Sequence, residues 1–419
     1  MRPSFGRFLA PAGLLFIAAT TLVPLPHQAV ASRNTPIWWL VCGDHGGIDV
    51  VNNVLLFVPF AAGLRLLNLK ARSVIGLGAA LSLGIELLQL TVIPGRDASL
   101  SDLLTNTSGS WLGIVLGRNL SLLLRPKPAL AIRLSLVGGV IWLGVQGATA
   151  LLLQPWVPSQ AMRGAWNRSV YGRAPFDGQV LSVFLSGWPL RNAVAPVSSD
   201  LADRIREGRI HLELQLLSGK RKSLWSPIVE LLGPRGAVLA IYASREDLAF
   251  QPPMRSASLR LGRPALRLPG ALPSTPGVEL QVAAGEVGST LWAEWTSRGQ
   301  TYRAVQPLSP SFGWSLLTWF RYAYGQEVRV ITMLWIALWL VPVGYWAALA
   351  PGQRRFRAMA LLLLVAAGLA LVPLVAGYQP VHWSEWAAAL AGVAVGWAGH
   401  LFVPYFERRC DSPFINESC

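Results

Sequence analysis

The segment VIGLGAALSLGIELLQLTVI, at positions 74–93, contains twenty residues and only one charged side chain, that of Glu86. An α-helix needs about 20 mostly apolar residues to cross the hydrocarbon core of a bilayer. Seven other segments have the same character, and the eight expected spans are residues 8–26, 50–68, 74–93, 104–124, 130–153, 328–350, 358–377 and 384–404. The sequence therefore predicts a polytopic α-helical membrane protein with about eight transmembrane helices.

The amino-acid composition agrees with this class of protein. Of the 419 residues, 53% are hydrophobic and 14% are charged, whereas soluble domains carry about 25% charged residues. The net charge of +15 comes from short basic runs that border apolar segments, which differs from the soluble basic face of a nucleic-acid-binding protein. We expect the lipid bilayer to be a partner, and we expect no nucleic acid.

Basic residues occupy alternate linkers between the expected spans. They precede the first span, follow the second, fourth and sixth, and follow the eighth, at Arg2, Arg7, Arg65, Lys70, Arg72, Arg118, Arg125, Lys127, Arg133, Arg354, Arg355, Arg357, Arg408 and Arg409. Because Lys and Arg accumulate in cytoplasmic loops, both termini are expected in the cytoplasm. An alternative for the N-terminus is a cleaved signal peptide that ends at Ala31; either outcome leaves residue 32 outside.

The long insert between the fifth and sixth spans has a different hydrophobic pattern, in which apolar and polar residues alternate as in half-buried strands. The expected strands are residues 210–216, 227–232, 237–243, 256–261, 278–282 and 291–295, and a short helix is expected near 201–206. Turn signals such as Gly233-Pro234 separate these elements. The pattern predicts an inserted all-β sandwich or jelly roll on the extracytoplasmic side.

These patterns divide the chain into four parts. We predict a four-helix membrane core at 1–126, a fifth transmembrane helix at 127–155, the β domain at 156–326, and three C-terminal transmembrane helices with a short cytoplasmic tail at 327–419. Aromatic residues concentrate at 312–324, which indicates a segment at the outer membrane interface. The three cysteines have no metal-ligand spacing, and no metal or cofactor is expected.

Polar side chains collect in the second, third and fourth spans, where burial in lipid is costly unless they are paired. Ser82, Glu86 and Gln89 share one face of the third span by their spacing. Asp44, His45, Asp49, Asn52, Asn53, Arg96, Asp97, Asp102 and Asn106 lie at the same, outer side. We expect these groups to converge on one site. The face of Asn106 continues as Gly109, Gly113 and Gly117, a stripe typical of tight helix packing.

The N-terminal third of the chain, residues 8–124, resembles the VanZ-like family of membrane proteins. The matching residues, in order and spacing, are Asp49, Asn53, Phe57, Pro59, Ser82, Glu86, Gln89, Arg96, Asp102, Asn106, Gly109 and Gly113. The resemblance implies a multi-pass protein of the bacterial plasma membrane and a link to glycopeptide-antibiotic resistance. It implies no particular reaction.

The insert resembles the concanavalin-like, or laminin-G-like, lectin fold. The resemblance rests on Phe176-Asp177-Gly178, the strand after Gly208, and the pair of strands 228–232 and 237–242. It implies a glycan-binding surface on which aromatic rings stack against sugars, and the candidate aromatics are Trp188, Trp225, Tyr242 and Trp292. No cluster of Asp and Asn is dense enough to predict calcium.

Three functional hypotheses follow. The first is a non-enzymatic envelope protein that binds or senses a surface glycan or a partner protein through its β domain. The second is an outer-leaflet enzyme that acts on a lipid-linked or phosphate-bearing envelope substrate, with Glu86 as general acid or base and Arg96 as the anion-binding group. In that case Asp102 is a further catalytic candidate, and Asp49, Asn53, Gln89 and Asn106 bind the substrate. The third is a proton-coupled transporter, which the lack of an internal repeat disfavours.

Overall fold

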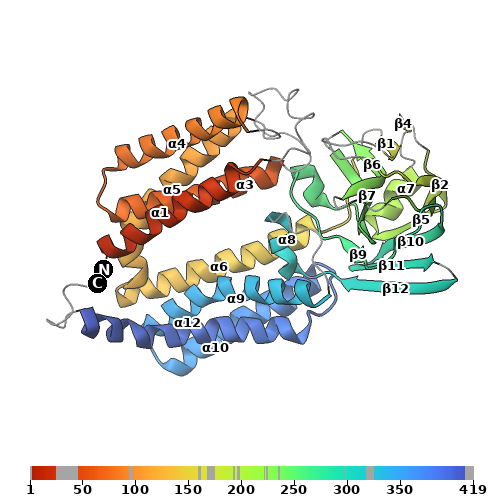
Figure 1. The fold of residues 1–419 in the computed structure, drawn as a ribbon. Helices are drawn as coiled ribbons and strands as arrows, with labels where there is room; N and C mark the ends of the chain where they lie inside the picture. The colour runs from red at the N-terminus through yellow and green to blue at the C-terminus, as the bar shows by residue number, and fades with distance from the viewer. Residues whose placement is uncertain are drawn as a thin grey trace.

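The computed structural model consists of a helical bundle with a β domain at one end (Figure 1). It describes residues 2–24, 46–93, 98–158, 162–167, 175–191, 194–195, 199–220, 222, 225–234, 236–297, 299–317 and 325–410. The start of the first helix and the end of the last helix lie at the end of the bundle remote from the β domain.

Each of the eight predicted spans overlaps a long helix or a continuous helical run. These are α1 (Arg2–Thr21), α3 (Gly46–Leu66), α4 (Ala71–Thr91), α5 (Leu100–Leu124), α6 (Pro128–Leu152), α9 (Gly325–Leu349), the continuous run of α10 (Arg354–Ala366), η4 (Ala367–Leu371) and α11 (Val372–Val375), and α12 (Trp383–Cys410). Within the described chain, six helices are long and apolar enough to cross a membrane. The other two, α5 and α12, contain more polar residues and pack along α3 and α9. The chain is therefore a multi-pass membrane protein.

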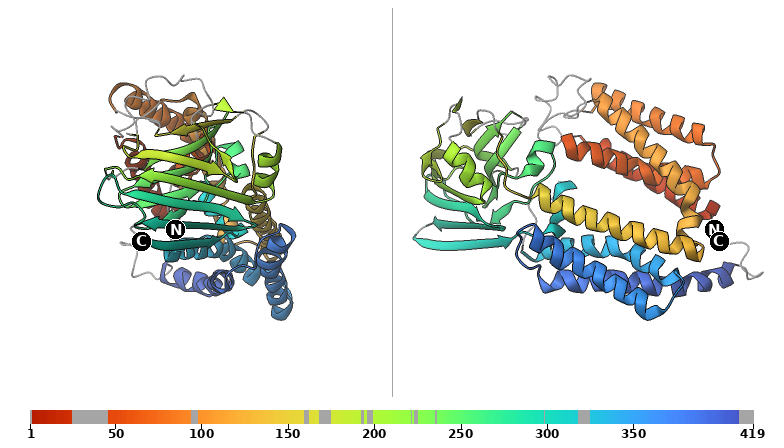
Figure 2. Two further views of the ribbon diagram at one scale, coloured as in Figure 1. Left: turned by 90° about the vertical axis from the view of Figure 1, so that its right-hand side faces the viewer. Right: turned by 180° about the vertical axis from the view of Figure 1, so that it is seen from behind.

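The bundle has two layers, which the right-hand view of Figure 2 shows clearly. The helices α1, α3, α4 and α5 form one layer, and α6, α9, α10 to α11 and α12 form the other. The layers are joined at the end remote from the β domain, where Trp346 Nε1 of α9 donates to the carbonyl oxygen of Leu123 at 2.9 Å. Tyr345 also donates to the carbonyl oxygen of Leu124.

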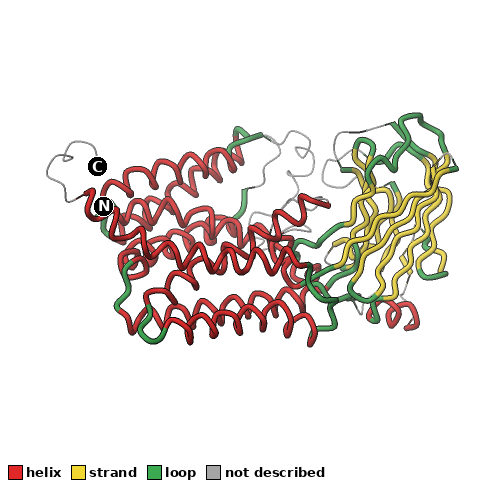
Figure 3. The backbone as a smooth tube through the Cα atoms, turned by 90° about the horizontal axis from the view of Figure 1, so that it is seen from below, coloured by secondary structure: helices red, strands yellow, loops and turns green. Residues whose placement is uncertain are grey.

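The β domain contains two six-stranded sheets in which every described strand pairing is antiparallel. Sheet 1 has the order β4-β1-β6-β7-β8-β9, and sheet 2 has the order β12-β11-β10-β5-β2-β3. The strands are β1 (Met162–Trp166), β2 (Gln179–Leu185), β3 (Trp188–Pro189), β4 (Val194–Ala195), β5 (Arg209–Leu217), β6 (Ser226–Gly233), β7 (Gly236–Ser244), β8 (Asp247–Gln251), β9 (Leu266–Leu268), β10 (Glu279–Val287), β11 (Thr290–Ser297) and β12 (Gln300–Pro307). The helix α7 (Ser199–Arg206) precedes β5. The predicted two-sheet β insert is confirmed (Figure 3).

The strand predicted at 256–261 is wrong. Arg255–Leu259 form the 3-10 helix η2, and the next residue, Arg260, adopts a left-handed conformation with φ 55° that ends it. The turn packs on the start of α3, where Gly47 N donates to the carbonyl oxygen of Arg260 at 3.2 Å. A Cβ atom at Gly47 would lie 2.2 Å from the carbonyl oxygen of Leu259. Contact with a distant helix therefore determines this local structure.

The core of the β domain continues into the adjacent end of the bundle. Leu153, Val328 and Tyr378 of the bundle side belong to the same cluster of buried apolar residues as the inner faces of both sheets. Tyr378 donates its hydroxyl to the carbonyl oxygen of Ala150 at 2.8 Å. Because removal of the bundle would expose part of this core, functional tests of the β domain require the full chain.

The aromatic segment predicted at 312–324 has a different environment from the one expected. It begins in η3 (Pro310–Gly313) and α8 (Trp314–Leu317), where Phe312 and Trp314 are buried in the shared core. Trp314 Nε1 donates to Thr332 Oγ1 at 3.0 Å. The rest of the predicted segment, 318–324, lies outside the described residues. The described aromatics thus join the domain to the bundle.

Candidate functional site

The polar residues of α4 are buried against neighbouring helices. Glu86 is 8% exposed, and its Oε2 accepts from Ser99 N at 2.7 Å. Ser82 Oγ accepts from Asn106 Nδ2 of α5 at 2.9 Å, and Gln89 Nε2 donates to the carbonyl oxygen of Thr21 at 3.1 Å. The three polar residues of this face are thus hydrogen-bonded to three different segments: the N-cap of α5, the α5 helix itself, and the end of α1.

Three other candidate residues, Asp49, Asn53 and Asp102, are only half-buried. Asp102 is half-buried in the first turn of α5, close enough to Glu86 for an electrostatic interaction. Asp49 and Asn53 are half-buried in the first two turns of α3. Within the described chain, the buried Oδ1 atom of Asn106 has no hydrogen-bond partner. Arg96, together with Asp44, His45 and Asp97, lies outside the described residues.

The glycine stripe of α5 lies against the backbone of α3. A Cβ atom at Gly109 would lie 2.2 Å from the carbonyl oxygen of Val54. At Gly113 it would lie 2.5 Å from that of Val58, and at Gly117 2.9 Å from that of Ala62. Real Cβ contacts do not reach these distances, so the three glycines allow a close approach of two helices. Asn106, one turn before this stripe, is hydrogen-bonded to Ser82 of the polar cluster on α4.

The hydrogen bond from Ser99 N to Glu86 predicts that Glu86 stabilises the start of α5. Ser99 is the N-cap of α5, so Glu86→Ala would leave a part-buried N–H unpaired at a helix start, at a cost of about 1–3 kcal/mol. Glu86→Gln retains a carbonyl acceptor and is expected to unfold close to the wild-type temperature in detergent. Equal unfolding temperatures for both variants and the wild type would contradict this role.

The catalytic role of Glu86 stays a hypothesis. If Glu86 transfers a proton, Glu86→Gln abolishes activity while the protein still folds, because an amide cannot act as acid or base. The Ser99 N–H engages one carboxylate oxygen of Glu86, Oε2.

A groove of about 520 Å³ lies on the open face of sheet 2. Three rows of residues in register on β5, β10 and β11 run along it: His211, Gly285 and Trp292; Glu213, Ala283 and Glu294; Gln215, Gln281 and Thr296. Ser182 and Phe184 of β2 and Thr301 of β12 also line the groove. The row of His211, Gly285 and Trp292 is nearest the bundle. The turn that follows β10 lies just beyond this row, and its Ser289 accepts a hydrogen bond from Gln379 N, which precedes α12. Residues two apart on a strand are about 7 Å apart, so the rows span about 14 Å.

Small residues form the floor of this groove. Ala283 lies between the two carboxylates of the middle row, and Gly285 lies between His211 and Trp292. A Cβ atom at Gly285 would lie 1.9 Å from the carbonyl oxygen of Ile210 and 3.1 Å from Trp292 Cε2. The glycine thus leaves room for the indole, whose ring centroid is 5.3 Å from that of His211.

Of the four aromatic residues proposed to bind glycans, Trp292 lines the groove and the others do not. Trp188 is exposed on β3, at the edge of sheet 2. Trp225 lies under the guanidinium of Arg267, and Tyr242 is 7% exposed and directed at Glu230. The polar residues of the groove, such as Glu213, Gln215 and Glu294, occupy the polar positions of strands whose alternation the sequence shows. Only the strand register, which the sequence does not reveal, brings them together.

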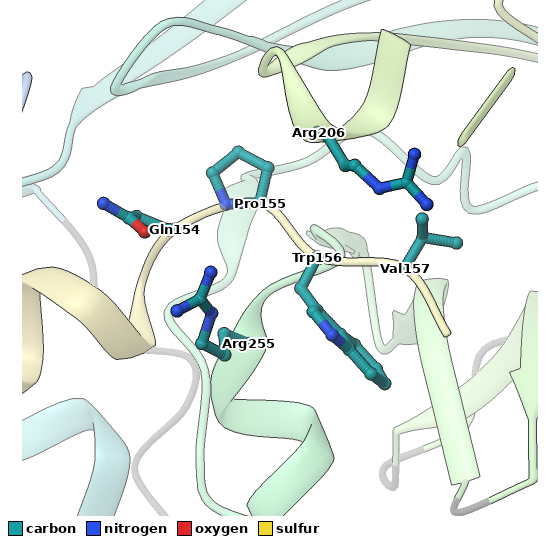
Figure 4. A pocket seen from close by; sticks show the side chains of 6 residues that line it. All are labelled: Gln154, Pro155, Trp156, Val157, Arg206 and Arg255. Carbon is teal, nitrogen blue, oxygen red and sulfur yellow. The ribbon is translucent and has the colours of Figure 1, made fainter. Parts of the chain in front are cut away.

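A second pocket, of about 650 Å³, lies where α6 joins the β domain (Figure 4). Its lining includes Gln154, Trp156, Arg206 and Arg255. The two guanidinium groups lie on either side of the Pro155–Trp156 backbone, and Arg206 is bonded to Asp203 at 2.6 Å. Because its charged groups do not converge, this pocket does not form a recognisable binding site.

The polar cluster and the glycine stripe lie in a part of the chain that matches a known family. Residues 12–123 match the VanZ/LLP1 family model. This VanZ/LLP1 region covers half of α1, all of α3 and α4, and nearly all of α5, about a quarter of the chain. The resemblance of the N-terminal third is thus confirmed at the level of the family.

A search of curated proteins and a search of solved structures gave no match for the chain. The resemblance of the β domain to a lectin fold therefore stays a prediction.

Proposed function

We propose that this multi-pass membrane protein binds a glycan of the bacterial envelope through the groove on sheet 2. The observation that carries the proposal is the position of Trp292 beside two rows of hydrogen-bonding side chains, over a floor of small residues. Ligand pockets typically combine apolar or aromatic surface with a few polar groups that orient the ligand.

The chemistry of the groove suits a sugar chain. An indole ring offers a flat apolar surface against which the apolar face of a sugar ring can stack. The carboxylates of Glu213 and Glu294 and the amides of Gln215 and Gln281 are acceptors and donors for hydroxyl groups. A length of about 14 Å along the strands accommodates a short oligosaccharide.

The distribution of charge supports an extracytoplasmic position for this groove. The basic linkers between α3 and α4, α5 and α6, and α9 and α10 lie at the end of the bundle remote from the β domain. The positive-inside rule makes that end cytoplasmic. The β domain then faces the outside of the plasma membrane, where envelope glycans occur, and both chain ends face the cytoplasm.

Trp292→Ala is expected to reduce binding of envelope-derived oligosaccharides at least tenfold, because it removes the stacking surface. Full-length protein in nanodiscs would be titrated with a panel of such oligosaccharides by calorimetry. Trp188→Ala is the matched control, since Trp188 is exposed in the same sheet but outside the groove. Equal loss in both variants, or no binding by the wild type, would contradict the proposal.

A further inference from the structure

The groove has the opposite charge to the chain as a whole. The sequence contains 36 Lys and Arg against 21 Asp and Glu. Among the described residues, the groove lining contains the carboxylates of Glu213 and Glu294 and no Lys or Arg. The groove lining is therefore acidic where the chain as a whole is basic.

The two carboxylates stand on opposite sides of one small residue. Glu213 on β5 and Glu294 on β11 are both in register with Ala283 on β10. Neighbouring strands are about 4.8 Å apart, so the two Cα atoms are about 10 Å apart, with only a methyl group between them on the floor. A ligand group that rests on Ala283 therefore lies between two carboxylates.

Each carboxylate has one exposed basic neighbour among the described residues. His211 Nε2 is 3.7 Å from Glu213 Oε1, and Arg303 Nε is 3.4 Å from Glu294 Oε1. All four side chains are more than 40% exposed, and exposed pairs of this kind contribute little. The carboxylates stay available to a ligand.

We infer that the groove selects glycans that carry free amino groups and disfavours anionic glycans. An ammonium group over Ala283 can form charge-assisted hydrogen bonds to Glu213 and Glu294. A uronate or phosphate group at the same place meets two like charges, which disfavours its binding. This inference rests on the proposed glycan-binding function and adds the chemical class of the ligand.

Three tetrasaccharides of equal length test the inference: a glucosamine tetramer, an N-acetylglucosamine tetramer and a galacturonate tetramer. We expect full-length protein in nanodiscs to bind the amine about tenfold more tightly than the neutral tetramer, and the uronate most weakly. The preference for the amine should decline as the salt concentration rises, because exposed charges are screened.

The double variant Glu213→Gln/Glu294→Gln is expected to remove the preference for the amine while it retains binding of the neutral tetramer. Asp200→Asn/Glu207→Gln is the matched control, because these carboxylates are exposed in the same domain but outside the groove. Binding of all three tetramers with equal affinity, or tightest binding of the uronate, overturns the charge selection and leaves glycan binding intact. Failure of all three to bind overturns the proposed function together with this inference.

Discussion

Glu286→Gln is expected to reduce the loss of stability that the wild-type protein shows as the pH rises from about 4.5 to about 8. Glu286 points inward from the end of β10 nearest the bundle and is 1% exposed. Its Oε2 atom has no hydrogen-bond partner within the described chain. Burial raises the pKa of this carboxyl from its ordinary value of 4.5 to about 8.

The direction of the effect follows from the protons bound in each state. Below pH 4.5 the carboxyl of Glu286 is protonated in both the folded and the unfolded chain, and its contribution to stability is fully present. Between pH 4.5 and 8 the folded state retains this proton and the unfolded state loses it, so the free energy of unfolding falls as the pH rises. A pKa difference of this size corresponds to about 4–5 kcal/mol as an upper limit.

The measurement is thermal unfolding of the full-length protein in detergent at several pH values between 4 and 9. Glu279→Gln is the control, because Glu279 is exposed at the other end of the same strand. We expect the control to retain the wild-type pH dependence. A parallel dependence in wild type and Glu286→Gln would show that Glu286 does not titrate in this range. Glu286 lies close enough to Tyr378 to influence its ionisation. Burial raises the pKa of the Tyr378 hydroxyl, and the Glu286 carboxylate raises it further.

Gly109→Ala is expected to destabilise the VanZ/LLP1 region, with a lower unfolding temperature and a lower yield of folded protein. The added methyl group would lie 2.2 Å from the carbonyl oxygen of Val54, so α3 and α5 must separate. Overpacking of this kind costs about 1–3 kcal/mol, and the double variant Gly109→Ala/Gly113→Ala should cost more.

Gly84→Ala provides a control with the opposite expected sign. Among the described residues, no atom outside the adjacent turns of α4 lies within 4 Å of a Cβ placed at Gly84, which is in the middle of this helix. Alanine is the better helix former by about 1 kcal/mol, so Gly84→Ala should unfold at or above the wild-type temperature. An unfolding temperature of Gly109→Ala equal to that of Gly84→Ala would contradict the close approach of α3 and α5.

The spans could be predicted because length and apolarity are local properties of a sequence. The expected span at 74–93 is found as α4, Ala71–Thr91, and the small shift arises because helix ends depend on their surroundings. The strand predicted at 256–261 failed for a related reason. Alternation of apolar residues there does not encode the left-handed Arg260 or the contact of η2 with Gly47, which comes from α3.

The sequence by itself determined the membrane class, the two-sheet β insert and the shared face of Ser82, Glu86 and Gln89, because hydrophobic period and helical spacing act over a few residues. Tertiary structure alone decided which residues form the groove. Glu213 and Glu294 are about eighty positions apart, and they flank Ala283 only because β10 pairs with β5 and β11 in one register. The short turn at residues 288–289 sets the register of β10 with β11. The pairing of β10 with β5 joins segments about seventy positions apart, and no local pattern in the chain encodes it.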